Sequence, residues 1–109
     1  MKPGLGITIA ILGAAALTAL VVSLVQGIPS PEDPYRPSVA AGEVVYLEAC
    51  AKCHGASGEG TALAPGLRGR KLRLDWVEAK VLDGTGRMPR FPNIQGDALK
   101  NLTNHINKM

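Results

Sequence analysis

Hydrophobic and polar positions divide the chain into two unlike parts. Residues 5–28 form an uncharged run, LGITIAILGAAALTALVVSLVQGI, in which only Thr8, Thr18, Ser23 and Gln26 are polar. As a helix that rises ~1.5 Å per residue, this run would be about 36 Å long. Because the hydrocarbon core of a bilayer is roughly 30 Å thick, the pattern predicts one N-terminal transmembrane helix within residues 1–28.

A cleaved signal peptide is the alternative explanation of this run. The apolar part of a signal peptide is usually ~7–15 residues long and ends at a small-x-small cleavage site. Here the run is longer, and SLVQGIPSPEDP offers no convincing site, so we favour an uncleaved anchor. Lys2 precedes the run, whereas Glu32 and Asp33 follow it. This charge asymmetry predicts a cytoplasmic amino terminus and a domain on the periplasmic side of the cytoplasmic (inner) membrane.

A proline-rich segment, PSPEDPYRP, follows at residues 29–37. Its four prolines cannot continue a helix and favour a stiff, extended chain, which predicts a linker between the anchor and a domain. The domain itself is predicted to comprise residues 38–109. So small a domain rarely builds a sufficient hydrophobic core alone, and a bound cofactor is a common remedy.

The polar and apolar pattern of this domain predicts an all-α fold, because no alternating run indicates a sheet. The first helix is expected over about residues 39–50, with Ser38 as its N-cap. Gly42, Tyr46 and Cys50 are spaced four residues apart and would share one face of that helix.

Two further helices are expected. One begins at Asp75, which has capping-box spacing to Glu78, and ends near Gly84. The other covers about residues 97–108. Between the helices lie long loops rich in glycine and proline, as expected if they surround a bound group. The apolar faces are expected to be Leu74, Val77 and Val81 on the earlier helix, and Leu99, Leu102 and Ile106 on the later one.

Both cysteines and one of the two histidines lie in the stretch ACAKCHGASGEG. A redox dithiol needs no histidine after its second cysteine and normally lies in a βαβ unit, which this sequence lacks. A zinc site needs four ligands, and His105 is the one remaining soft ligand besides Cys50, Cys53 and His54. A structural disulfide explains neither the histidine nor the loops. The spacing is that of covalent haem attachment, with two thioethers and an adjacent imidazole for the iron.

Beyond CAKCH, the domain resembles a monohaem class I cytochrome c. Gly42 and Tyr46 lie at the family's spacing before the first cysteine. In APGL, Pro65 resembles the proline whose carbonyl group orients the proximal histidine, and Leu67 resembles a haem-packing leucine. In GRMPRF, Met88 resembles the distal ligand. The chain departs from the family in a short segment before Met88 and in a histidine on the last helix.

This resemblance implies a small cytochrome c fold around one covalent haem c. Cys50 and Cys53 would hold the haem, and His54 and Met88 would be its axial ligands. With both axial positions filled, the iron has no open site, which favours a single-electron carrier over an enzyme. The carrier could be a subunit of a respiratory or photosynthetic membrane complex or a free membrane-tethered shuttle. A haem sensor or an enzyme subunit would need an open iron site.

The charge pattern adds an expectation about partners. The formal net charge is +3, and six cations lie in the two loops expected near the haem. We expect this basic rim to favour redox partners with acidic docking surfaces, whereas the lack of interleaved aromatic residues argues against nucleic acid. His105 is interpreted as a surface or helix-interface residue, and Trp76 as either core or a donor to a haem propionate. The basic rim consists of Arg68, Arg70, Lys71, Arg73, Arg87 and Arg90.

Overall fold

The computed structural model describes residues 30–109, so the transmembrane helix expected within residues 1–28 lies outside the described residues. In the described part the domain is mostly helical, which confirms the expected all-α class. No helix there has the length and apolar character needed to cross a bilayer. The helices are α2 (Gly42–Val45), the π-helical segment η1 (Tyr46–Cys50), α3 (Ala51–His54), α4 (Leu74–Asp83) and α5 (Gly96–Asn107).

The first helical stretch begins later than the sequence predicts. Ala41 is the N-cap of α2, and no side chain caps the helix, so the prediction of Ser38 as N-cap was wrong. Packing against α5 determines this start. A Cβ atom on Gly42 would collide with the backbone oxygen of Asn101, and the Asn101 amide donates a 2.9 Å hydrogen bond to the carbonyl of Ala40.

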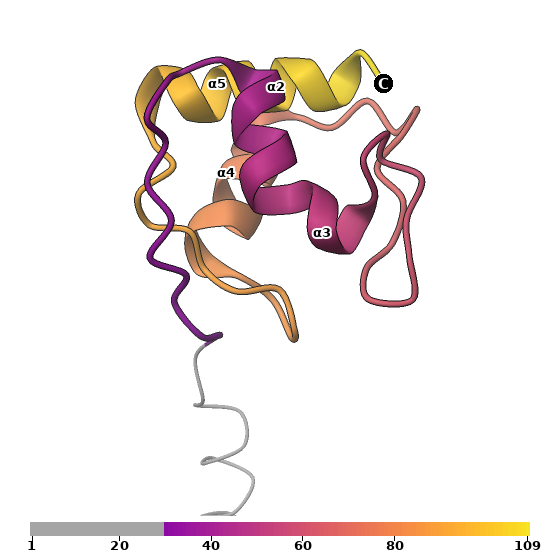
Figure 1. Ribbon diagram of the computed structural model, residues 1–109, viewed down its shortest axis with the longest axis horizontal. Helices are drawn as coiled ribbons and strands as arrows, with labels where there is room; N and C mark the ends of the chain where they lie inside the picture. The colour runs from indigo at the N-terminus through magenta and orange to yellow at the C-terminus, as the bar shows by residue number, and fades with distance from the viewer. Residues whose placement is uncertain (1–29) are drawn as a thin grey trace, which may run out of the picture.

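The same stretch continues past Cys50, where the sequence predicted its end. In η1 the backbone N–H of Ala51 bonds to the carbonyl of Tyr46, five residues earlier, so this turn is wider than an α-helical turn. The chain then re-enters an α-helix as α3. Figure 1 shows α3 displaced sideways from the axis of α2. The wider turn therefore shifts the helical register just before Cys53 and His54.

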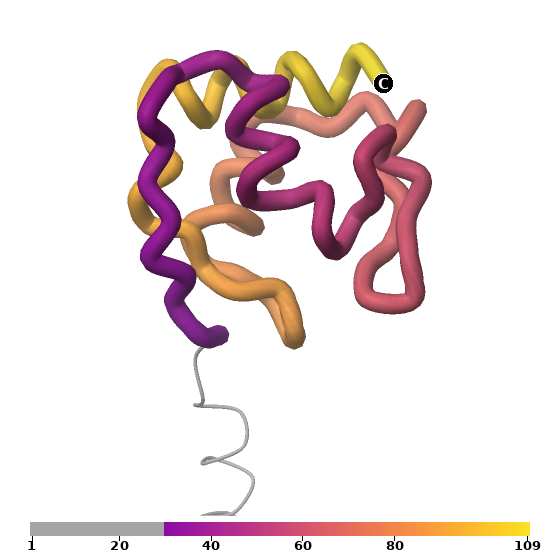
Figure 2. The backbone as a smooth tube through the Cα atoms, in the orientation of Figure 1, coloured from indigo at the N-terminus to yellow at the C-terminus, as the bar shows by residue number. Residues whose placement is uncertain are grey.

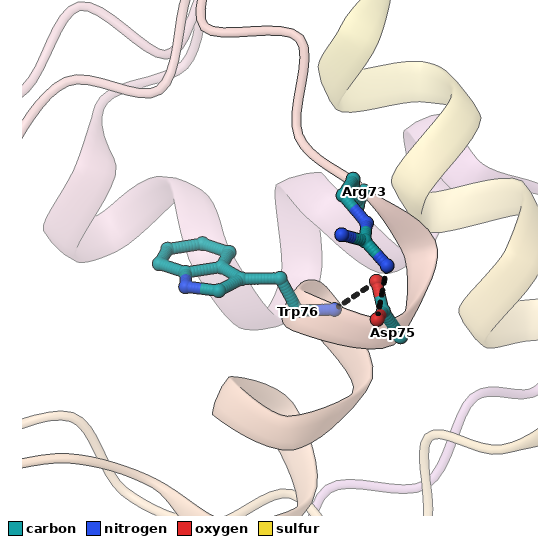
Figure 3. Close-up of polar contacts among 3 residues, drawn as sticks. All are labelled: Arg73, Asp75 and Trp76. Carbon is teal, nitrogen blue, oxygen red and sulfur yellow. Dashed lines mark hydrogen bonds and ion pairs between the residues drawn. The ribbon is translucent and has the colours of Figure 1, made fainter.

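Helix α4 begins at Leu74, and the predicted capping box was wrong. The Asp75 carboxylate accepts the N–H of Trp76 at 3.0 Å and pairs with Arg73 at 2.8 Å (Figure 3). The helix begins one residue earlier than predicted because the carbonyl of Arg73 accepts the N–H of Val77 at 3.0 Å. Leu74 was expected on the apolar face but is 44% exposed.

The remaining helical predictions agree with the structure. Val77 and Val81 are buried, and α4 ends before Gly84 as expected. Helix α5 begins and ends within one residue of the predicted bounds, and it packs across α2 (Figure 1). The core joins α2, η1, α4 and α5 with the loop residues Leu67, Phe91 and Ile94. Its members on α5 are Ala98, Leu99, Leu102 and Ile106.

The described part of the proline-rich segment, residues 30–37, is extended and lies against the domain. Figure 2 shows it as the indigo tube running beside the orange chain between α4 and α5. The backbone N–H of Arg90 donates to Pro31 at 2.8 Å, and the N–H of Asp33 donates to Arg90 at 2.7 Å. Tyr35 packs against the core. The segment is thus fastened to the domain.

Candidate haem-binding site

The imidazole of His54, at the end of α3, is oriented by the loop that follows it. Its Nδ1 atom lies 2.7 Å from the carbonyl oxygen of Pro65. Because a carbonyl oxygen can only accept, Nδ1 carries the hydrogen in this contact. The lone pair of Nε2 is then free to bind a metal, which is how a second-sphere contact fixes the tautomer of a histidine ligand.

The loop after His54 also closes on the last carbonyl groups of α3. The N–H of Gly60 donates to the backbone carbonyl of His54 at 2.7 Å, and the Thr61 hydroxyl donates to the backbone carbonyl of Cys53 at 2.5 Å. The buried Tyr46 hydroxyl donates to the backbone carbonyl of Gly55 at 2.6 Å. These contacts supply partners for carbonyl groups that a helix end leaves free. The sequence did not predict the roles of Thr61 and Gly60, although the glycines of GASGEG were a signal for a tight loop here.

Gly60 allows the two sides of this loop to approach each other closely. Its φ angle of +87° lies in the left-handed region that favours glycine, and an added Cβ would lie 2.7 Å from the nitrogen of Gly66. A larger residue at position 60 would push the chain at Pro65 and Gly66 away from α3. The close approach therefore keeps the Pro65 carbonyl within reach of His54.

Cys50 and Cys53 are half-buried and form no disulfide. Burial, with a smaller contribution from Cys53, raises the pKa of the Cys50 thiol to about 12. Burial therefore favours the neutral thiol over the thiolate. Among residues 30–109, no three side chains of His, Cys, Asp or Glu gather as metal ligands. Two thiols and one imidazole fall short of the four ligands of a zinc site, whereas their spacing matches covalent haem attachment.

Leu67, Met88 and Cys50 all border the same hydrophobic cluster. Leu67 is buried in the core, and Met88 and Cys50 pack half-buried against the same hydrophobic cluster. Met88 ends a tight turn in which its backbone exchanges hydrogen bonds of 3.1 and 2.9 Å with Thr85. Two thiols three residues apart can form the two thioether bonds of a haem c, and a free imidazole nitrogen and a thioether sulfur can bind its iron. The residues present therefore fit that group.

Two residues with open roles have clear positions. Trp76 is 42% exposed, so it is not a core residue. Its ring lies 5.8 Å from the Arg70 guanidinium and 5.5 Å from the Lys80 ammonium, at cation–π distance, and its indole points away from the Arg73–Asp75 pair (Figure 3). His105 is a helix-interface residue, as interpreted from the sequence: its ring is centred 5.6 Å from that of Tyr46.

The basic rim is only partly neutralised within the domain. Arg73 pairs with Asp75 at 2.8 Å, and Arg90 pairs with Glu32 at 3.4 Å. Arg68 donates a hydrogen bond to a backbone carbonyl. The other three cations of the rim are exposed and form no ion pair with any residue between 30 and 109: Arg70, Lys71 and Arg87.

Comparison with known proteins agrees with this geometry. The family model described as "cytochrome C oxidase, cbb3-type, subunit III" matches residues 37–106. Cytochrome c-555 of Methylococcus capsulatus is 37% identical over 79 residues, which cover 70% of this chain. The match spans 63% of that relative, less than two thirds of its length. Among solved structures there is no significant match. The chain therefore belongs to the cbb3-type subunit III family of c-type cytochromes, which implies a covalent haem c on a cysteine pair such as Cys50 and Cys53.

Proposed function

We propose that this protein carries single electrons, with His54 and Met88 as the axial ligands of its haem. When bound, the haem supplies a one-electron couple between ferric and ferrous iron. Cys50 and Cys53 hold it covalently, and Pro65 orients the imidazole of His54. The His54–Pro65 contact of 2.7 Å is the observation that carries this assignment, because it leaves Nε2 free for a metal.

Binding of Met88 to the iron is what makes the protein an electron carrier and not an enzyme. A thioether ligand favours the reduced state and raises the reduction potential. If His54 and Met88 both bind the iron, the protein itself would supply both of its axial ligands. Neither oxygen nor a substrate then has a place at the metal, so the function is electron transfer between proteins.

We further propose that the protein is a subunit of a respiratory or photosynthetic membrane complex. In this proposal the apolar run within residues 1–28 anchors the chain in the cytoplasmic membrane, and the haem domain lies on the periplasmic side. The attachment of residues 30–37 to the domain supports a fixed position, because it leaves little free linker for travel between distant partners. The family's printed description, which names an oxidase subunit, favours the same role.

The basic rim is proposed as the docking surface for redox partners. Arg70, Lys71 and Arg87 are exposed and form no ion pair among the described residues, so their charge is available to an acidic partner. Opposite charges on two docking surfaces speed their encounter and make association sensitive to salt. Electron transfer needs only brief contact, for which such a surface is well suited.

Visible spectroscopy with carbon monoxide tests the assignment of the ligands. We expect the purified full-length protein to show the spectrum of a haem with two thioether bonds and, when reduced, to bind no carbon monoxide. The Met88→Ala variant should bind carbon monoxide and have a lower reduction potential. Carbon monoxide binding by the unaltered protein would instead indicate an open iron site and hence a sensor or an enzyme.

Purification in mild detergent tests the role in a complex. A subunit should bring stoichiometric partner proteins with it. A protein that is extracted from membranes alone, yet exchanges electrons with purified complexes, would be a free tethered shuttle.

A further inference from the structure

Arg90, two residues after Met88, contacts the N-terminal segment through both its backbone and its side chain. Its backbone N–H donates to Pro31 at 2.8 Å, and its carbonyl accepts the N–H of Asp33 at 2.7 Å. Its side chain donates from Nε to the carbonyl of Ser30 at 3.1 Å and pairs through Nη2 with Glu32 at 3.4 Å.

The same segment is fastened at its other end to the helix that carries the cysteines. The Tyr35 hydroxyl donates to Glu48 in η1 at 3.1 Å. Asp33 pairs with Lys52 in α3 at 3.7 Å. Residues 30–35, which we call the strap, therefore connect the cysteine-bearing helix with the loop that carries Met88.

A close packing contact joins the strap directly to the Met88 turn. A Cβ atom added to Gly84 would lie 2.7 Å from the carbonyl oxygen of Met88 and 2.7 Å from the Cβ of Ser30. Ser30 and Met88 thus both pack against one backbone position, where Gly84 leaves no room for a side chain. A displacement of the strap would therefore be transmitted to this turn.

Besides the strap, the core packing of Met88 and Phe91 and two backbone attachments fix the chain around Met88. Its own backbone bonds to Thr85 within the turn, and Phe91 donates its N–H to Val81 at 2.7 Å. Between these two attachments, Arg90 makes its four polar contacts with the strap alone. The position of the turn that carries Met88 thus depends in part on a segment that lies more than fifty residues earlier in the sequence.

We propose that the strap is a positioning element for Met88 and that Arg90 is the positioning residue through which it acts. This inference rests on the proposed function, in which Met88 is an axial ligand. A firmly held Met88 excludes competing ligands and sustains a high reduction potential. When the strap is released, Met88 leaves its position more readily, and an added ligand can take its place.

The test uses the full-length protein with its haem, in the ferric form, titrated with imidazole and followed by visible spectroscopy. Arg90→Ala should bind imidazole about five- to tenfold more tightly than the unaltered protein, since one or two hydrogen bonds are lost. Its reduction potential should also fall. Arg87→Ala is the matched control, because it removes the same charge from the same loop without a contact to the strap. Arg90→Lys should give an intermediate affinity.

Asp33→Pro tests the strap from its own side, because it removes the N–H that bonds to Arg90 and also the carboxylate that pairs with Lys52 and accepts the N–H of Tyr35. It should increase imidazole affinity in the same direction. Urea unfolding of each variant shows whether the domain remains folded under the titration conditions.

Equal imidazole affinities and potentials for Arg90→Ala and Arg87→Ala would overturn the inference while leaving Met88 as a ligand. An unchanged spectrum and potential in Met88→Ala would instead overturn the proposed ligand and the inference with it.

Discussion

The Nδ1 atom of His54 and the carbonyl oxygen of Pro65 are eleven residues apart in sequence but 2.7 Å apart in the structure. This contact requires the intervening loop to fold back on the end of α3. The loop does so through Gly60, whose N–H bonds to the carbonyl of His54, and through Thr61, which bonds to Cys53. The orientation of the imidazole is therefore a property of the whole loop.

Alanine at Gly60 should disrupt this arrangement more than alanine at Gly69. Both glycines have positive φ angles, +87° and +75°, so both substitutions incur about 1–2 kcal/mol of backbone strain. A Cβ added at Gly69 would meet open space, whereas a Cβ added at Gly60 would lie 2.7 Å from the nitrogen of Gly66. We expect Gly60→Ala to lower the free energy of urea unfolding by at least ~1–3 kcal/mol more than Gly69→Ala.

The reduction potential provides a second measurement for this pair. Gly60→Ala should shift it because the Pro65 carbonyl moves relative to His54, whereas Gly69→Ala should leave it unchanged. If the two variants unfold at the same urea concentration and share one potential, the close approach at Gly60 does not position the imidazole.

Gly42→Ala distinguishes helix propensity from helix packing. At an open helical site this change would stabilise by about 1 kcal/mol. Here the new Cβ would collide with the backbone of Asn101 in α5, which must move away from α2. We therefore predict a loss of about 2–3 kcal/mol in the free energy of unfolding. Glu43→Ala, at the exposed neighbouring position, should change it by less than about 1 kcal/mol. A gain in stability for Gly42→Ala would contradict the crossing of α2 and α5.

The parts of the fold that follow from local pattern could be predicted from the sequence. The stripe of Leu99, Leu102 and Ile106 repeats every three to four residues, and it located α5 within one residue. The Cys-x-x-Cys-His spacing is a local chemical signature, and it indicated covalent haem. Both features depend on neighbours in sequence, which a single chain displays directly.

Features that depend on distant contacts could not be predicted in this way. The start of α2 is determined by Asn101, some sixty residues later, and not by the capping residue Ser38. The wider turn of η1 has no sequence signature that we recognised. The attachment of the proline-rich segment depends on Arg90, which bonds to Ser30 across sixty positions. Arg90 was assigned only to the basic rim, because charge is visible in a sequence and a backbone partner is not.

The contact between Tyr35 and Glu48 predicts a pH dependence of stability. Burial and the hydrogen bond to Glu48 raise the pKa of Tyr35 from 10.0 to about 12. The folded protein thus holds this proton more tightly than the unfolded chain does. The resulting stabilisation is complete below about pH 10 and is lost as the pH rises from about 10 to about 12.

Urea unfolding at several alkaline pH values measures this effect. Over that interval the unaltered protein should lose more stability than Tyr35→Phe, by on the order of 1 kcal/mol after allowance for solvent screening. Tyr46 is present in both proteins, so its own titration cancels in the difference. Parallel stability curves for the two proteins would show that Tyr35 does not hold its proton more tightly when folded.

Charge reversal at Lys71 tests whether the basic rim guides redox partners. Lys71 is exposed and forms no ion pair within residues 30–109, so its charge acts on an approaching partner without internal compensation. We expect Lys71→Glu to slow electron transfer with an acidic redox protein at low salt by about three- to tenfold, since steering depends on the local field. The difference should disappear near 1 M salt, where charges are screened beyond about 3 Å.

Lys100→Glu, an equal charge change at an exposed position of α5, is the control. If Lys100→Glu slows transfer as much as Lys71→Glu, then net charge governs the encounter and the rim has no special part in docking.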